Sequence, residues 1–373
     1  MHPMSVTLHA TPLAATTVPP RHVAANGRVR VAIIGATGYV GGELVRWLAG
    51  HPAVAIVGLV GRDRDAEPIA RTRPHLARTE LLIDAALPET DAVFVALPHG
   101  QAAAVVPGLA AAGLAIIDLG ADFRLRDPAD YPRWYHFEHP APELLASAVY
   151  GLPELHRAQL AAAGATAGPI IAAPGCYATA AILALAPLAR AGLLGDVVVD
   201  GKSGVSGAGR EPRPDLTYGE VNENVTAYGL DGHRHTAEME QELGAVAAEG
   251  GRDAPDPVTF VPHLVPMTRG ILATCHVRPG RSVDQAELDD LYRAAYADEP
   301  FVHMVDEPPA TKHVLASNEA RIHVKWQPRS GRIVVLAALD NLAKGAASQA
   351  VQAFNVLYGL DERTGLSALP VAP

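Results

Sequence analysis

The chain has 373 residues, 40 acidic and 30 basic side chains, and a formal net charge of −10 at pH 7. This length suffices for two domains with hydrophobic cores, and the negative charge argues against a general nucleic-acid binder, which would carry a basic face. Apolar runs end well before the roughly 18 residues of a membrane span. The two cysteines are too few for a disulfide scaffold and fit a reducing compartment. We therefore expect a cytoplasmic protein without nucleic-acid or membrane partners.

Residues 1–27 contain no acidic side chain and many small ones, and the first acid in the chain is Glu43. This segment lacks the continuous apolar stretch of a secretory signal and has few arginines, so a targeting peptide is the weaker interpretation. We expect residues 1–27 to form a disordered extension.

Strand-like and helix-like segments alternate through the first half of the chain. The apolar run 29–35 ends at a glycine, as a strand buried on both faces does. Val40, Leu44 and Leu48 then have the spacing of one helix face. Further strand-like segments lie at 54–61, 91–100 and 114–123, with a helix-like segment at 101–113. The alternation predicts an α/β fold with a doubly wound parallel sheet.

From Cys176 onward the pattern changes. An apolar run at 176–194 predicts a buried helix, and 341–360 predicts a striped helix that returns to the first domain. Long strand-like stretches lie at 196–210, 256–280 and 321–340, with helix-like stretches at 237–249 and 284–298. We expect an α+β domain with a mostly antiparallel sheet at 176–339, and a first domain made of 28–175 and 340–373.

A glycine-rich turn follows the first strand. Its spacing, Gly-x-x-Gly-x-x-Gly, lets backbone N–H groups approach a pyrophosphate at a helix N-terminus, as in a Rossmann-type domain. A tight structural turn is the alternative. The residues expected to contact the dinucleotide are Gly35, Ala36, Thr37, Gly38, Tyr39, Val40 and Gly41.

The end of the second strand bears on the choice of cofactor. An NAD-specific site would place an acid about 20 residues beyond the glycine loop, but Arg62 stands there and can hold a 2′-phosphate. Asp63 and Asp65 weaken this inference. The alternative is that Arg62 is a solvated turn residue without a ligand. The pattern favours NADP over NAD.

Cys176 begins the long apolar helix after "APG". The positive end of a helix dipole favours a thiolate, so we expect a lowered pKa and a reactive cysteine. Spacing alone does not distinguish a reactive cysteine from one that is packed in a core. Cys275, inside a strand-like segment, fits a core residue better.

Two histidines, His233 and His235, stand one residue apart in "GHRH". The sequence offers no third ligand nearby, so we expect no metal and interpret the pair as a general acid or base, with Glu238 placed to orient a histidine. Ordinary packed or surface histidines are the alternative.

Three arginines stand in glycine-rich or otherwise uncharged motifs: Arg124, Arg210 and Arg269. In an acidic chain, such arginines suggest local capture of a carboxylate or phosphate, and Ser206 lies in the same glycine-rich segment as Arg210. Each arginine alone is otherwise an ordinary surface charge.

Together these motifs resemble those of the N-acetyl-γ-glutamyl-phosphate reductases, a family related to aspartate-semialdehyde dehydrogenase. The matching segments are "GATGYVGGEL", "ALPHG", "DLGADFRL", "YGLPEL", "PGCYAT", "SGVSGAGR", "GHRHTAEMEQEL", "PMTRGILAT" and "DNLAKGAASQAVQAFN". They run in family order from about Arg28 to Leu360, so the resemblance covers all but the N-terminal extension.

The resemblance implies reduction of N-acetyl-glutamyl 5-phosphate by NADPH to N-acetyl-glutamate 5-semialdehyde, with Cys176 as nucleophile through a thioester. It implies an acid or base in the His233–His235 pair; we favour His233, with His235 beside it. It also implies a homodimer or homotetramer. Expected substrate contacts are Arg124, Ser206, Arg210, Glu238 and Arg269. Expected cofactor contacts beyond the glycine loop are Arg62, Pro98, His99 and Asn341.

Two alternatives remain open on the sequence. A reductase of the same mechanism could act on carrier-bound aminoadipyl or glutamyl phosphate, or on aspartyl phosphate. A non-catalytic NADP-binding redox sensor would keep the glycine loop but would have little reason to combine it with the cysteine, histidine and arginine motifs.

Overall fold

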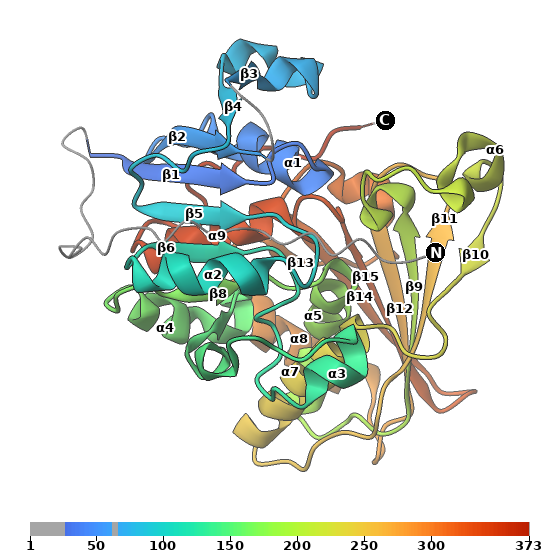
Figure 1. The fold of residues 1–373 in the computed structure, drawn as a ribbon. Helices are drawn as coiled ribbons and strands as arrows, with labels where there is room; N and C mark the ends of the chain where they lie inside the picture. Colours follow the sequence, from blue (N-terminus) through green and yellow to red (C-terminus); the bar gives the residue numbers. More distant parts are fainter. Residues whose placement is uncertain (1–26, 62–65, 373) are drawn as a thin grey trace.

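The computed structural model describes residues 27–61 and 66–372, which form two sheets with their helices (Figure 1). Residues 1–26 of the expected extension, and the expected cofactor residue Arg62, lie outside this part of the chain.

The first sheet has eight strands in the order β3-β4-β2-β1-β5-β6-β8-β7. Every pairing in it is parallel except that between β3 and β4, so the predicted doubly wound parallel sheet is confirmed. In chain order the strands are β1 (Val29–Ile34), β2 (Val54–Val60), β3 (Glu67–Pro68), β4 (Leu82–Asp84), β5 (Ala92–Val95), β6 (Ala115–Asp118), β7 (Val149–Tyr150) and β8 (Ile170–Ala172).

Helices cover both faces of this sheet (Figure 1). Helices α1 (Tyr39–Leu48), α4 (Pro153–Ala163) and α9 (Ala347–Leu357) bury one face, and α2 (Ala102–Ala111) and α3 (Asp130–Tyr135) bury the other. The alternation along β5 shows why both faces are apolar: Phe94 points to the first layer, while Val93 and Val95 point to the second. Helix α9 packs on α1 and α4, so the expected return of the C-terminal helix to the first domain is confirmed.

The second sheet has seven strands in the order β10-β11-β9-β12-β15-β14-β13. Four of its six pairings are antiparallel, and only β11–β9 and β13–β14 are parallel, which confirms the mostly antiparallel prediction. The strands are β9 (Val197–Gly204), β10 (Thr226–Ala227), β11 (Thr259–Val265), β12 (Ile271–Val277), β13 (Val302–Met304), β14 (Ala320–Gln327) and β15 (Arg332–Leu339).

Helix α5 (Cys176–Arg190) connects the two sheets. It follows β8 of the first sheet after three residues and packs on β12 and β15 of the second, so its N-terminus lies where the sheets meet. Helix α8 (Gln285–Tyr296) packs on β14, and α7 (His235–Glu249) packs on α5. Residues 177–189 of α5 are all buried, as its continuous apolar sequence predicts.

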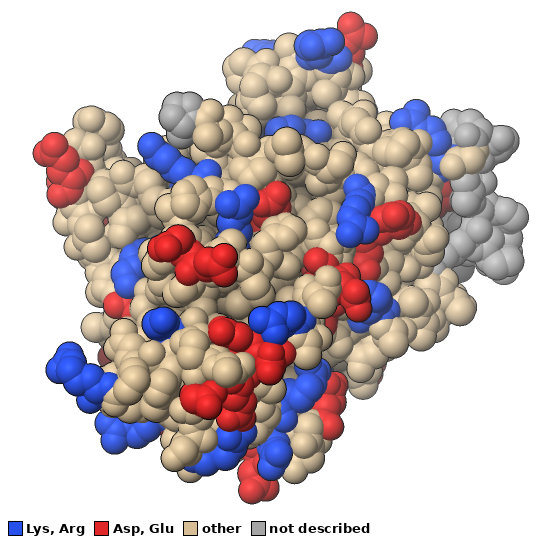
Figure 2. Space-filling model, turned by 180° about the vertical axis from the view of Figure 1, so that it is seen from behind, with Lys and Arg blue, Asp and Glu red and all other residues tan. Residues whose placement is uncertain are grey.

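Short elements complete the chain. They are α6 (Tyr218–Val221), η1 (Ile69–Arg71), η2 (Pro74–Thr79), η3 (Pro142–Ser147), η4 (Val205–Ala208), η5 (Pro214–Leu216) and η6 (Thr311–Val314). Within residues 27–61 and 66–372, none of the helices combines the length and apolar character that crossing a bilayer requires. On the face seen in Figure 2, basic and acidic side chains are interspersed.

Candidate active site

Cys176 is the first residue of α5, and the extended Gly175 (φ −69°, ψ 145°) caps the helix. The Gly175 carbonyl accepts the first helical hydrogen bond from the Thr179 N–H at 2.8 Å and a second bond from the Thr179 hydroxyl at 3.0 Å. The turn that aims Cys176 is therefore held by its own backbone, at the carboxyl edge of the first sheet. That edge is where parallel α/β sheets bind ligands.

Gly175 and Gly345 lie too close to their neighbours to carry a side chain. A Cβ at Gly175 would lie 2.4 Å from His235 Nε2, and a Cβ at Gly345 would lie 2.8 Å from the Cβ of Cys176. Both distances are too short for any other residue type. The imidazole of His235 and the loop before α9 therefore pack directly on the turn that contains Cys176.

Glu238 is the buried centre of this arrangement. Its Oε1 accepts a hydrogen bond from Arg124 Nη1 at 3.0 Å, and its Oε2 accepts from the Tyr150 hydroxyl and the Gly175 N–H, both at 2.8 Å. Glu238 is 0% exposed and both of its oxygens accept hydrogen bonds within the chain, so it holds the turn that carries Cys176. Its expected contact with substrate stays a prediction. Tyr150 belongs to the segment "YGLPEL", but the sequence did not indicate that it contacts Glu238.

Arg124 and Arg269 are both engaged internally. Arg124 donates from Nε to the Ala173 carbonyl and from Nη2 to the Leu119 carbonyl, besides its bond to Glu238. Arg269 forms ion pairs with Glu43 and Asp340, which join α1 to the segment after β15. Both guanidiniums therefore have carboxylate partners that the sequence did not indicate, and their expected contacts with substrate stay a prediction.

The two histidines have different surroundings. His233 packs edge-on to the rings of Tyr177, Tyr228 and Phe260, and its Nδ1 accepts a hydrogen bond from the His235 N–H at 3.1 Å. His235 is 6% exposed, its Nε2 lies 3.9 Å from Glu238 Oε1, and its Nδ1 has no hydrogen-bond partner among the described residues. Burial lowers the pKa of His233 to about 4 and that of His235 well below 6.5. Both imidazoles are therefore neutral at pH 7.

The expected lowering of the Cys176 pKa is wrong in this structure. Burial raises the pKa of the thiol to about 11, although Arg124, the Tyr177 N–H and Arg234 act in the opposite direction. Loss of solvation outweighs the helix N-terminus, although Cys176 as a residue is only partly buried. Cys275 is fully buried in β12, as its apolar surroundings in the sequence suggested.

Asn341 and Ser206 meet each other close to the cysteine turn. Asn341 Nδ2 donates to Ser206 Oγ at 2.9 Å, and Asn341 Oδ1 accepts from the Gly270 N–H at 2.7 Å. A Cβ at Gly345 would also lie 2.8 Å from the Cα of Asn341. Predicted cofactor and substrate residues from distant segments therefore converge beside Cys176.

The glycine loop lies between the ends of β1 and β5. Gly35 has φ +86°, and a Cβ there would stand 2.4 Å from the Ala96 carbonyl oxygen; a Cβ at Gly41 would stand 2.2 Å from the Gly35 oxygen. Gly38 caps α1 without a side-chain hydrogen bond, and the first turn of α1 has no acid. The backbone N–H groups of this turn therefore suit an anion, and the site fits a dinucleotide. Pro98 and His99 follow β5 at the same edge.

A residue that the sequence did not single out also contacts this loop. Arg73 Nη2 donates to the Thr37 carbonyl at 2.8 Å, and Arg210 Nη1 donates to the same oxygen at 2.9 Å. A cavity of about 450 Å³ adjoins both arginines and includes Tyr39 and Ser206 in its wall. No motif marks Arg73, since only folding brings it to the loop.

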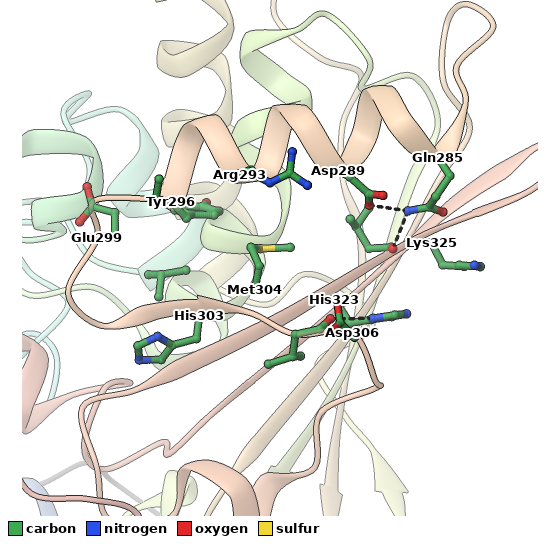
Figure 3. A pocket seen from close by; sticks show the side chains of 14 residues that line it. Gln285, Asp289, Arg293, Tyr296, Glu299, His303, Met304, Asp306, His323 and Lys325 are labelled. Carbon is green, nitrogen blue, oxygen red and sulfur yellow. Dashed lines mark hydrogen bonds between the residues drawn. The ribbon is translucent and has the colours of Figure 1, made fainter.

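A larger cavity of about 570 Å³ lies elsewhere, between α8 and strands β13 and β14 (Figure 3). Some polar side chains in its wall bond to one another or to backbone. Gln285 donates to Asp289 and to the Val324 carbonyl, and His323 contacts the Val305 carbonyl. None of the predicted site residues lines this cavity.

Two family profiles match the chain. The profile described as the semialdehyde dehydrogenase NAD binding domain covers residues 30–163, and the one described as the semialdehyde dehydrogenase dimerisation domain covers residues 176–341. The first ends before Cys176 and the second begins on it.

Curated relatives match across nearly the whole chain. N-acetyl-gamma-glutamyl-phosphate reductase of Heliobacterium modesticaldum is 48% identical, covering 92% of this chain and 100% of the relative. The protein of the same name from Desulforudis audaxviator is 47% identical, covering 91% and 98%. A similar protein from Halorhodospira halophila is 48% identical, covering 92% and 100%.

Solved structures support the fold. Aspartate semialdehyde dehydrogenase II of Vibrio cholerae, complexed with ASA, superposes with a TM-score of 0.67 at 18% identity, covering 88% of this chain and 98% of that one. Aspartate semialdehyde dehydrogenase of Candida albicans, solved with NADP, gives 0.64 at 16% identity, covering 88% and 98%. At these identities the likeness establishes a shared two-domain architecture.

Proposed function

Because this chain belongs to the N-acetyl-gamma-glutamyl-phosphate reductases of the semialdehyde dehydrogenase family, with 43% to 48% identity to curated members, we propose that it makes N-acetyl-L-glutamate 5-semialdehyde. The substrate is N-acetyl-L-glutamyl 5-phosphate, the reductant is NADPH, and phosphate is released, as in arginine biosynthesis. One observation carries the proposal: Cys176 stands at the N-terminus of α5 where the two sheets meet, against His235 and the loop of Asn341.

We propose that Cys176 is the nucleophile. Its sulfur attacks the acyl carbon, the bond to phosphate breaks, and a thioester forms while His235 takes the thiol proton. Bound NADPH supplies the hydride that reduces this thioester. His235 then gives its proton to the oxygen of the reduced thioester, which forms a thiohemiacetal. When the carbon–sulfur bond breaks, the hydroxyl proton passes back through His235 to the sulfur, which releases the aldehyde and restores the thiol. These reaction steps require no metal.

The geometry favours His235 over His233 as acid and base. His235 lies against Gly175 and has a ring nitrogen without a partner in the described chain, whereas His233 Nδ1 already accepts from the His235 N–H. Burial favours the neutral form of both members of the pair, thiol and imidazole. Proton transfer therefore accompanies attack rather than preceding it, with Arg124 stabilising the developing thiolate.

We propose NADP as the preferred nicotinamide cofactor, held by residues 35–41 with Pro98 and His99. Residues 28–175 and 340–373 form the cofactor domain, and 176–339 form the catalytic and oligomerisation domain. The face of the second sheet away from α5 keeps Leu272, Val334 and Leu336 half-exposed, which supports assembly into a homodimer or homotetramer there. The expected location is the cytoplasm.

The test is the reverse reaction, followed as phosphate-dependent NADPH formation from N-acetyl-glutamate 5-semialdehyde. We expect Cys176→Ser to bind NADPH with unchanged affinity and to lose turnover by at least a thousandfold, since an alcohol is a far weaker nucleophile than a thiol. Cys275→Ala, in the core of β12, should retain turnover. Near-parental activity of Cys176→Ser would refute covalent catalysis. Faster turnover of aspartate semialdehyde would favour the aspartyl alternative, and cofactor binding without any turnover would favour a redox sensor.

A further inference from the structure

We propose that Arg73 and Arg210 form a clamp for a phosphoryl group of the nicotinamide dinucleotide at the glycine loop. This inference rests on the proposed function, which requires such a cofactor, and adds a residue from outside the family motifs. It also reassigns Arg210 from substrate to cofactor.

Arg73 and Arg210 converge on one backbone atom. Arg73 precedes η2 in the first domain, and Arg210 follows η4 in the second, yet both guanidiniums donate to the carbonyl oxygen of Thr37, at 2.8 and 2.9 Å. Two cations that share one acceptor repel each other. An anion placed between them removes that repulsion, so the pair suits a doubly charged ligand.

Arg73 is buried and has no carboxylate bonded to it among the described residues. Its residue is only 8% exposed, its Nε has no hydrogen-bond partner among the described residues, and no ion pair joins it to a carboxylate in that part of the chain. Burial, followed by the charge of Arg210, lowers the pKa of Arg73, although Tyr39 and Glu43 oppose this. A buried guanidinium without a directly bonded counter-ion is costly, and a phosphoryl group would provide one.

A ring contact holds Arg73 beside a cavity. The guanidinium of Arg73 lies 5.0 Å above the centre of the Tyr39 ring, which fixes its plane, and both arginines line the cavity of about 450 Å³ beside α1. Tyr39 is the first residue of α1, whose N-terminus has no side-chain cap and no acid in its first turn. Two guanidiniums and the first residue of α1 thus line one cavity, in which Glu43 and Glu211 are the acidic wall residues.

Two phosphoryl groups of the cofactor share this chemistry: the 2′-phosphate of NADPH and the diphosphate bridge common to NADPH and NADH. Titration of the full chain with each cofactor, followed by quenching of intrinsic fluorescence, separates them. Arg73→Met and Arg210→Met should each raise the NADPH dissociation constant at least tenfold. Unchanged NADH binding would assign the clamp to the 2′-phosphate, and an equal loss for both cofactors would assign it to the bridge.

Arg71→Met is the matched control, because Arg71 lies in η1 two residues away with its side chain 74% exposed. Its NADPH affinity should stay within twofold of the parent. Since Arg73 is buried, chemical denaturation without cofactor checks that the Arg73→Met variant still folds. Arg210 is exposed, so Arg210→Met tests the clamp without a risk to folding. Arg73→Lys should recover part of the affinity.

Unchanged affinity for both cofactors in the two methionine variants would overturn the clamp. So would a rise in KM for the acyl phosphate with unchanged cofactor affinity, since the arginines would then hold substrate. Binding does not depend on turnover, so a chain that loses NADPH in these variants but never reduces the acyl phosphate would keep the clamp and refute only the proposed substrate.

Discussion

Asp118 ends β6 close to the active-site turn, and its replacement by asparagine tests the buried electrostatics there. The side chain is 0% exposed; Oδ1 accepts from the Gly120 N–H at 2.8 Å, and Oδ2 has no partner in the described residues. Burial, followed by the charge of Asp122, raises the pKa of Asp118 from 3.8 to about 7, although Gly120 and Arg124 oppose this. An amide keeps the Oδ1 acceptor and removes the ionisation.

The expected effect depends on pH. In the unfolded chain Asp118 ionises near 3.8, whereas in the folded protein it keeps its proton up to about pH 7. Between these values the folded state binds more protons, so the free energy of unfolding falls as the pH rises. A shift of roughly 3 units corresponds to about 4 kcal/mol, of which about 3 kcal/mol arises between pH 4.5 and pH 8.

Urea denaturation of the parent and of Asp118→Asn across this pH range measures the effect. The free energy of unfolding of the variant, minus that of the parent, should rise by about 3 kcal/mol from pH 4.5 to pH 8. Asp196→Asn, at a side chain 57% exposed, should show no comparable change. A difference for Asp118→Asn that stays constant within about 1 kcal/mol would refute the reasoning, because it would mean that the carboxylate is ionised and stabilised in the folded state.

Two further predictions concern the active-site turn. Oε1 of Glu238 accepts from Arg124 and Oε2 accepts from Tyr150 and Gly175. Glu238→Gln replaces one of these two acceptors with an amide donor and removes the charge, so it should lower the free energy of unfolding by about 3 to 5 kcal/mol and reduce kcat. Denaturation and steady-state rates measure this against the exposed Glu249→Gln, and a loss below about 1 kcal/mol would contradict the role of Glu238 as a buried anchor. His235→Asn should lower kcat/KM more than His233→Asn. In the parent kcat/KM should stay constant to below pH 6.5, because burial keeps His235 neutral there; equal, mild losses in both variants would dismiss the pair as catalytic.

The elements that the sequence predicted well are those whose signals lie in consecutive residues. The run 29–35, the glycines 35, 38 and 41 and the apolar spacing after them specify a strand, turn and helix without reference to the rest of the chain. The same holds for α5, whose unbroken apolar sequence corresponds to its burial on all sides. The position of Cys176 at a helix N-terminus was predictable for this reason.

Partners distant in sequence were not predictable. Arg124 and Glu238 are 114 residues apart, and Arg269 and Glu43 are 226 apart, so the arginines looked like free anion receptors although carboxylates in the fold engage them. Arg73 reaches the glycine loop only because the segment after β2 folds back over α1.

The sequence by itself determined the two-domain plan, the glycine loop and the place of the cysteine, because each depends on local backbone conformation and on the periodicity of apolar residues. Only the tertiary structure decided which charges are paired and which groups are desolvated. It therefore decided that the Cys176 thiol has a raised pKa, that His235 rather than His233 lies against its turn, and that Arg73 joins Arg210. Solvation and Coulomb energies depend on distances through space, and folding alone sets those distances.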